Sequence, residues 1–429
     1  MPFVPAHQPI LPMPSSNTAL AQRVLDWADA LAEHTDEPGR LTCAYLTPAH
    51  RATADRLHEW MLACGFDSVR RDAVGNVIGR YNAAPGAVAP ALVATGSHYD
   101  TVRNGGRYDG RLGILAPMAV VAGLHAEGRR LAFDLEVVGF AEEEGLRFGG
   151  SFMGSSAYAG CYDTAMLDLR DRDGVILRQA MLEAGLDPAR IPQAAVDARR
   201  LRHYFEIHIE QGPVLLERGL ALGVVTSIAG CVRRHLVLEG QAGHAGTTPM
   251  DMRRDAAAAA AEIVLAVERR CSGVPGLVGT VGMLEVPGGS VNVIPGRCEL
   301  SLDVRAGEDA VRDAALVDLE REIAAICERR RVAWRLEEVM RAAAVPCSED
   351  GRRRWRDALQ VLGHEPFELP SGAGHDAMVM ARVAPISMLF VRCGNGGVSH
   401  NPAETITAED VEAALSAARR FLEDLDQSA

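Results

Sequence analysis

The chain has 429 residues, of which 48% are hydrophobic and 24% are charged, and its formal net charge is −13. This length exceeds one ordinary hydrophobic core and indicates about two or three globular domains. The negative charge disfavours a nucleic-acid-binding surface, and no apolar run approaches the roughly 18 residues that cross a membrane. We therefore expect neither a nucleic-acid partner nor a membrane partner.

The cysteines and basic residues exclude several kinds of site and catalysis. The nine cysteines are scattered and include no C-x-x-C pair, which favours reduced thiols in a cytoplasmic protein over a disulfide framework. The basic residues are all arginine, and the lack of lysine excludes Schiff-base catalysis, a Walker-type phosphate loop and a metal site bridged by a modified lysine. Residues 1–17 are proline-rich and lack the regions of a secretory signal, so we expect a poorly ordered tail and a cytoplasmic location.

The first half of the chain alternates helices and strands. Two amphipathic helices are expected between residues 18 and 65, followed by a short strand at 76–81. Apolar runs at 91–98 and 131–141 predict two buried strands, joined by a glycine-rich loop and a helix at 116–124. This order predicts an α/β fold with a mostly parallel, mixed sheet flanked by helices and with its chemistry at the carboxyl ends of the strands.

A second pattern of strands and helices occupies residues 226–341. We expect two helices there, at 255–270 and 309–330, together with four short strands. The pattern predicts a small α/β sandwich inserted into a first domain that comprises residues 18–225 and 342–429. The remaining expected elements are helices at 349–362 and 408–425 and a strand at 384–391.

Polar clusters follow the predicted strands at four places. The first, GSHYDTVRNGGRYDGRLG, contains His98, Asp100 and Asp109. A metal-binding imidazole needs its second nitrogen held, and Asp100 is placed two residues from His98 to do this. The glycines around Asp109 let the backbone bend closely around an ion. Taken alone, the segment is equally consistent with a glycine-rich surface turn that contains an incidental histidine.

Three adjacent glutamates, Glu142, Glu143 and Glu144, close the second buried strand. Such a run is usually a solvated helix face, but unpaired charges at the end of a buried strand are costly. A divalent cation would neutralise them, and neighbouring glutamates can divide the roles of metal ligand and catalytic base.

Two further histidines complete the pattern. HIEQGP contains His208, where alternation places Glu206 and Glu210 on the same face and Gln211 begins a turn. GVSHNPAE contains His400 between a strand and a helix. Each histidine alone is more often a core or loop residue than a ligand. Together the clusters supply three histidines and two carboxylates at strand ends of one sheet, the mixture that a di-metal hydrolase needs.

Six ordered motifs carry a family resemblance from about residue 40 to the last helix. The chain resembles the aminoacylase and carboxypeptidase G superfamily of metallopeptidases, and within it the hydantoinase/carbamoylase branch. That branch contains allantoate amidohydrolases, N-carbamoyl-L-amino acid hydrolases and β-ureidopropionases. The motifs are GSHYDTVRNGGRYDG, EEEGLRFGGSFMGS, HIEQGPVLLE, GHAGTTPMDMRRDA, GGSVNVIPG with DVR, and SGAGHDA with GVSHNPAE.

The resemblance implies a zinc-exopeptidase-like catalytic domain that binds two divalent metal ions per subunit, with manganese the first candidate and zinc, cobalt or nickel the alternatives. It implies that Glu143 is the general base, and it makes Gln211 a plausible contact to the ureido group of the substrate. The implied metal ligands are His98, Asp109 as the bridge, Glu144, His208 and His400.

The resemblance also assigns functions to the inserted domain, which would be the lid and dimerisation domain of a homodimer. His244 would reach the active site of the neighbouring subunit and hydrogen-bond the oxyanion of the tetrahedral intermediate. Asn292 and Arg305 would hold the substrate carboxylate, which suits arginine because its fork matches a carboxylate bidentately.

Three substrates compete within the branch. Allantoate is the first candidate, because DEPGRLT, DAVGNVIGRY and GVSHNPAE look most like that group; cleavage to ureidoglycine, ammonia and carbon dioxide would belong to purine catabolism. N-carbamoyl-L-amino acid hydrolase and then β-ureidopropionase follow, and a peptidase or deacylase of the superfamily is more distant. A non-catalytic metal-dependent binding protein would lack a metal ligand or the base, and none is missing here. A dinucleotide-binding dehydrogenase is disfavoured because GSHYDTVRNGGRYDG does not contain a G-x-G-x-x-G motif at a strand-to-helix turn.

Overall fold

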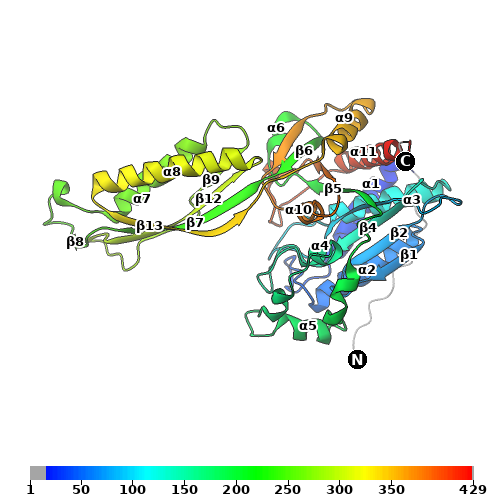
Figure 1. Ribbon diagram of the computed structural model, residues 1–429, viewed down its shortest axis with the longest axis horizontal. Coiled ribbons are helices and arrows are strands. Elements are labelled where there is room, and N and C mark those ends of the chain that lie inside the picture. Colours follow the sequence, from blue (N-terminus) through cyan, green and yellow to red (C-terminus); the bar gives the residue numbers. More distant parts are fainter. Residues whose placement is uncertain (1–15, 428–429) are drawn as a thin grey trace. The chain divides into compact units, whose positions relative to one another are not determined.

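The structure is a computed structural model that describes residues 16–427. Most of the predicted tail lies outside the described residues, although Asn17 is already the first residue of a helix. The chain divides into two compact units, whose elements are labelled in Figure 1. The first unit holds the described residues up to Val225, Cys347–Glu368 and the described residues from His375 onward, and the second holds Thr226–Pro346 and Leu369–Gly374.

A mixed sheet forms the centre of the first unit. Its strands are β1 (Ser68–Arg71), β2 (Val77–Tyr81), β3 (Leu92–His98), β4 (Asp134–Phe140), β5 (Leu201–Ile209), β6 (Leu222–Ile228) and β16 (Ile386–Val391). They lie in the order β1-β2-β4-β3-β5-β16-β6. The central strands β4, β3, β5 and β16 are parallel to one another, whereas the outer strands pair antiparallel. The predicted mostly parallel sheet is confirmed.

Helices cover both faces of this sheet. They are α1 (Asn17–Ala32), α2 (Pro48–Ala63), α3 (Leu112–Ala126), α4 (Met153–Tyr158), α5 (Leu177–Glu183), α6 (Val214–Arg218), α9 (Glu349–Val361), α10 (Asp376–Met380) and α11 (Ala408–Gln427). Successive residues of a strand point to opposite faces. On β4, a Cβ at Gly139 would meet Ile114 of α3, whereas the Phe140 ring packs 5.9 Å from the ring of Tyr158 of α4.

The second unit contains an antiparallel sheet with two long helices on one face (Figure 1). Its strands are β7 (Gly230–Glu239), β9 (Leu277–Thr280), β10 (Leu284–Glu285), β12 (Arg297–Ala306) and β13 (Ala333–Ala342), and its helices are α7 (Ala256–Cys271) and α8 (Asp309–Arg330). Leu300 and Leu302 of β12 are buried in the core, whereas Ser301 and Asp303, which alternate with them, are partly exposed. The expected helices are present, but β7, β12 and β13 each have ten residues and are not short.

Short elements complete the second unit. A two-stranded ribbon pairs β8 (Gly243–His244) with β11 (Val293–Ile294), and β14 (Val345–Pro346) pairs with the end of β6. A last strand, β15 (Glu368–Ser371), leads into the return segment of this unit. That segment was not expected from the sequence, and the role of the unit as a lid or dimerisation domain stays a prediction.

Sequence patterns missed the short elements of the first unit. β1, α4 and α5 were not expected, because runs of four to seven residues carry little periodicity. The helix predicted at 116–124 begins earlier, at Leu112, directly after the glycine-rich loop. All nine cysteines are free, as expected from their spacing. Within residues 16–427, no helix is both long enough and apolar enough to span a membrane.

Candidate metal centre

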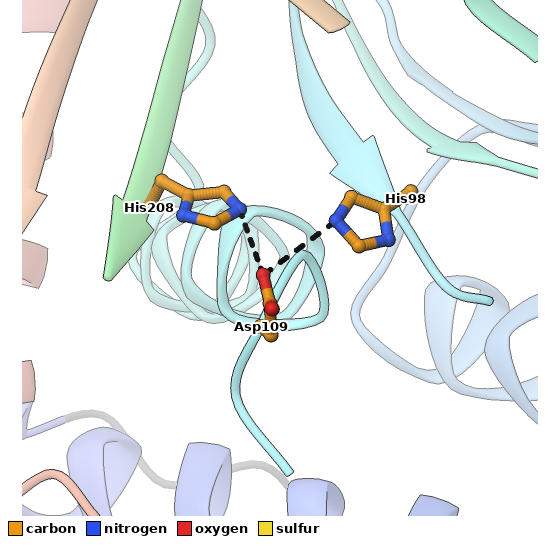
Figure 2. Close-up of side chains that lie close together, drawn as sticks. All are labelled: His98, Asp109 and His208. Carbon is orange, nitrogen blue, oxygen red and sulfur yellow. Dashed lines mark ion pairs between the residues drawn. The ribbon is translucent and has the colours of Figure 1, made fainter. Parts of the chain in front are cut away.

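Three side chains meet at the carboxyl ends of β3 and β5 (Figure 2). His98 is the last residue of β3, His208 is the penultimate residue of β5, and Asp109 lies in the glycine-rich loop before α3. Asp109 Oδ1 lies 3.7 Å from His98 Nε2 and 3.4 Å from His208 Nε2. Each residue is at most 4% exposed, so water is largely excluded from the space between them. Parallel strands bring their carboxyl ends to one edge of the sheet, which explains this meeting point.

Hydrogen bonds determine which nitrogen of each imidazole faces Asp109. Nδ1 of His208 donates to the carbonyl of Ile209 at 2.9 Å, which leaves Nε2 as the acceptor. Nδ1 of His98 lies 3.2 Å from the carbonyl of Asp100 and 3.3 Å from its Oδ1. Because both of these neighbours are acceptors, Nδ1 carries a hydrogen, and Nε2 faces Asp109. Burial alone would lower the pKa of His98, but its contacts with the carboxylates of Asp100 and Asp109 raise that pKa well above the ordinary value, so a bound cation would take the place of the Nε2 proton. Both imidazoles are therefore oriented to bind a cation beside Asp109.

Asp100 also links β3 to the glutamates that follow β4. Its two carboxylate oxygens accept hydrogen bonds from the backbone N–H groups of Glu143 and Glu144, each at 3.1 Å. Side-chain oxygens of these two glutamates lie within 4.8 Å of each other and of a ring nitrogen of His98. The buried Asp100 carboxylate thus fixes the positions of His98, Glu143 and Glu144 relative to one another.

His400 approaches the same centre from the loop before α11. Its Nε2 lies 3.1 Å from Asp109 Oδ2 and 3.8 Å from Glu144 Oε1. Gln211 Nε2 donates to both carboxylate oxygens of Asp109, at 3.2 and 3.1 Å. The five predicted ligands therefore form two groups that share one carboxylate: His98, Asp109 and His208, and Asp109, Glu144 and His400.

Burial dominates the electrostatics of this cluster. It raises the pKa of Glu143 well above its ordinary value and raises the pKa of Glu144 to about 7. It lowers the pKa of His208 to about 4, so this imidazole is neutral at pH 7. For Asp109, the effect of burial is outweighed by the neighbouring histidines, which lower its pKa well below the usual range. Several carboxylates buried together favour a nearby cation.

Two acidic residues of the predicted clusters make other contacts. Glu142 is buried, and its Oε1 accepts a backbone N–H of the following turn at 2.6 Å. Glu210 was expected on the same face as His208, and this stays a prediction. β5 ends at Ile209, and the Glu210 carboxylate accepts the first two backbone N–H groups of α6.

His244 and Asn292 lie together in the ribbon of the second unit. His244 is exposed and pairs with Val293 across the ribbon. The carbonyl of Asn292 accepts the backbone N–H of Ala245 at 2.9 Å. These two predicted substrate-contacting residues are therefore neighbours at one end of the unit, where Figure 1 labels β8.

Arg305 lies in the five-stranded sheet of the same unit, at the end of β12 that is farther from the ribbon. The ribbon follows the end of β7 and precedes the start of β12, where Glu239 pairs with Arg297, whereas Arg305 pairs with Cys231. The eight residue steps from Arg297 to Arg305 span about 27 Å at roughly 3.4 Å per step. Arg305 donates to both oxygens of Asp303, at 2.9 and 3.1 Å. The three predicted substrate contacts of this unit thus do not converge within one chain.

Comparison with known proteins places the chain in a family. The model of peptidase family M20/M25/M40 matches residues 94–424. The chain belongs to this family. The match spans every ligand candidate from His98 to His400 as well as the second unit.

Individual relatives are similar to this chain over nearly its whole length. An N-carbamoyl-L-amino acid amidohydrolase of Geobacillus stearothermophilus is 42% identical, with 91% of this chain and 94% of the relative covered. Allantoate deiminase 1 of Glycine max is 36% identical, with 92% and 87% covered. The crystal structure of a hydantoinase/carbamoylase family amidase from Burkholderia multivorans has a TM-score of 0.88 at 32% identity, with 95% and 98% covered. The resemblance predicted from the motifs is confirmed.

Three buried residues lie beside the candidate metal centre, and the sequence patterns predicted no role for them. The Glu404 carboxylate accepts the backbone N–H of Asp109 at 3.2 Å. Glu206 accepts the hydroxyl of Ser97 at 2.7 Å, and the ring of His375 packs 4.5 Å from that of His208. All three lie within or beside the motifs that carry the family resemblance, but nothing local in the sequence distinguishes them from ordinary polar residues.

Proposed function

We propose that the protein is a di-metal amidohydrolase that cleaves the terminal ureido C–N bond of a carboxylate-bearing substrate. One observation carries the proposal: the oxygens of Asp109 have ring nitrogens of His98, His208 and His400 within 3.7 Å. Two of the imidazoles face Oδ1 and the third faces Oδ2. Such a carboxylate suits a ligand that bridges two ions.

The donor set fits two divalent ions. The two residue groups described above each place their donor atoms within 4.8 Å of one another. The first group is buried throughout, whereas the second extends from the buried Asp109 to the exposed His400. Mixed imidazole and carboxylate ligation suits manganese, zinc, cobalt or nickel, and the resemblance makes manganese the first candidate. Bound there, the ions would polarise the scissile carbonyl and lower the pKa of the attacking water toward about 7.

Glu143 is placed to move the protons of the reaction. Its backbone is held by Asp100, and its carboxylate lies beside His98 and Glu144. Burial raises the pKa of Glu143, which brings a carboxylate closer to the range of a general base at neutral pH. Glu143 would take a proton from the attacking water and pass it to the departing ammonia. The remaining carbamate would then release carbon dioxide and the amine.

Gln211 supplies a contact suited to a ureido group. Its Nε2 is engaged by Asp109, whereas its Oε1 is buried and has no hydrogen-bond partner among residues 16–427. A carbonyl oxygen in this position can accept a ureido N–H, which supports the predicted role.

The separation of residues in the second unit supports a homodimer. A small substrate cannot span the roughly 27 Å that separates the ribbon end of β12 from Arg305. We therefore propose that Arg305 holds the substrate carboxylate and that His244 and Asn292 come from a second copy of the chain. Exposed apolar side chains in and beside the ribbon and its flanking turn support a contact between copies. They are Met250, Met252, Val291 and Val293.

Allantoate remains the first substrate candidate from the motifs. A specific observation favours the second candidate, an N-carbamoyl-L-amino acid. The identity to the Geobacillus stearothermophilus amidohydrolase is 42%, against 36% for the Glycine max allantoate deiminase. A cytoplasmic location is part of the proposal, and the nine free cysteines support it.

The test is hydrolysis of a panel of compounds by manganese-loaded protein, followed as ammonia release for the ureido compounds and as release of a free amino acid for the others. The panel contains allantoate, several N-carbamoyl-L-amino acids, β-ureidopropionate, a dipeptide and an N-acetyl amino acid. We expect ammonia from a ureido compound and little hydrolysis of the dipeptide or the acetyl compound. A preference for the dipeptide or acetyl compound would overturn the proposed reaction, whereas a preference for N-carbamoyl amino acids would overturn only the first substrate candidate.

A further inference from the structure

Glu404 joins two loops that carry proposed metal ligands. It is 3% exposed. Its Oε1 accepts the backbone N–H groups of Tyr108 and Asp109, at 2.9 and 3.2 Å, and its Oε2 accepts the hydroxyl of Ser399 at 2.8 Å. Ser399 directly precedes His400. We infer that Glu404 is a positioning residue that holds Asp109 and His400 at the spacing needed for the second metal ion.

The two metal groups differ in how their ligands are anchored. His98 and His208 belong to β3 and β5, whose backbones are fixed by the sheet. His400 lies in a loop, has a φ of 55° and exposes 51% of its side chain. A residue with a Cβ holds a left-handed conformation only when its surroundings enforce it. The loop around His400 therefore depends on contacts such as the one between Glu404 and Ser399.

The geometry at Asp109 shows a second effect of the same carboxylate. Ser399 Oγ lies 2.8 Å from Glu404 and 3.3 Å from Asp109 Oδ2. Glu404 thus fixes the backbone of Asp109 directly and reaches its side chain through one hydroxyl. Glu404 belongs to neither metal group, so its influence on metal binding is indirect.

Gly106 gives independent evidence that the carboxylate needs its space. A Cβ at Gly106 would lie 2.1 Å from both Cδ and Oε1 of Glu404. The φ of Gly106 is not in the left-handed region, so the space, and not the backbone conformation, requires glycine here. An alanine at this position would have to displace the Glu404 carboxylate.

The test is metal binding by the full chain. This inference rests on the proposed di-metal function, so the wild-type protein is stripped of metal, titrated with Co²⁺ and followed by elemental analysis and by the visible d–d absorption. We expect two ions per chain for the wild type. In Glu404→Ala the second ion should bind about 10–100-fold more weakly, the loss typical when a group that orients a ligand is removed. Excess metal should restore kcat.

Two variants separate positioning from general stability. Glu404→Gln should bind both ions almost as the wild type does. The amide oxygen of the glutamine can accept the backbone N–H groups, and its amide NH2 group can donate to the Ser399 hydroxyl. Asp410→Ala removes another buried carboxylate, which accepts two hydrogen bonds from Arg392 at 3.1 and 2.7 Å. It should lower the melting temperature and keep both ions. If Glu404→Ala does not fold, Glu404→Asp replaces it with the same expected loss.

A double-mutant cycle gives the sharpest outcome. Gly106→Ala should weaken the second ion as Glu404→Ala does, and the double variant should be no weaker than Glu404→Ala, because the added methyl group then has room. Unchanged affinity for the second ion in Glu404→Ala, or additive losses in the double variant, would overturn the inference. A wild type that binds fewer than two ions would instead overturn the proposed function.

Discussion

The two units hold their proposed functional residues in different ways. In the first unit, His98, Asp109 and His208 are almost fully buried, and hydrogen bonds within the unit orient both imidazoles. In the second unit, His244 is exposed and Arg305 is only partly buried on an open sheet. The first unit therefore contains a preorganised centre, whereas the second offers contacts that a substrate or a second subunit must complete.

The largest expected effect lies in the preorganised centre. Glu143→Gln keeps the size of the side chain but removes the proton acceptor, so kcat should fall by about 10²–10⁴ while two metal ions stay bound. Steady-state kinetics and elemental analysis of the same preparation check both parts.

The neighbouring glutamate is the matched control for this change. Glu142 makes its hydrogen bond to a backbone N–H and belongs to neither metal group, so Glu142→Gln should leave kcat within about tenfold of wild type. Equal losses in the two variants would mean that Glu143 is not the base.

A smaller effect is expected in the second unit. His244→Ala should lower kcat by about 10²–10³, the usual loss when one oxyanion donor is removed, and should leave metal binding unchanged. Initial rates at saturating substrate measure the change.

Mixing two inactive chains tests whether His244 acts in a partner. After Glu143→Gln and His244→Ala chains are dissociated together and reassembled, half of the sites in each mixed dimer would combine an intact Glu143 with an intact His244. Activity should then return. Reassembled mixtures that stay inactive, although mixed dimers form, would place His244 in its own chain's site or outside the reaction.

The smallest expected effect is a pH-dependent change in the free energy of unfolding, caused by a buried histidine of the first unit. Burial lowers the pKa of His203 to about 4, below the ordinary value of about 6.5, and its Nε2 lies 2.8 Å from Ser387 Oγ. A neutral buried histidine stabilises the fold fully above pH 6.5, and this contribution is lost as the pH falls through about 4.

Glutamine does not titrate, so a comparison of wild type with His203→Gln isolates the pH-dependent contribution of His203. The difference in unfolding free energy between wild type and variant should shrink by on the order of 3 kcal/mol as the pH falls from about 6.5 to below 4, as urea unfolding at several pH values would show. A difference that does not change with pH would contradict the assignment.

The same contrast explains what the sequence could predict. β3 ends in His98, and His208 is the penultimate residue of β5, so the meeting of these histidines at one sheet edge could be predicted from strand order. The two long helices of the second unit were likewise predicted from the strand and helix pattern of the sequence, and α8 has the expected bounds.

Other features depend on contacts that are distant in the chain. Glu404 bonds to a backbone N–H 295 residues away, so no local pattern could reveal it. The Glu210 carboxylate accepts the backbone N–H groups of Val214 and Leu215 at the start of α6, a contact that strand alternation does not predict. His244, Asn292 and Arg305 entered only through the family resemblance, since exposed polar residues carry no signal of burial or periodicity.

The central claim is that one carboxylate, Asp109, bridges two metal ions in the first unit. Crystals of the metal-loaded protein, measured at the absorption edge of the bound metal, test it most directly. We expect two anomalous peaks per chain, about 3.5–4 Å apart, one between His98 and His208 and one beside Glu144 and His400, with Asp109 touching both. A single peak, or peaks away from Asp109, would contradict it.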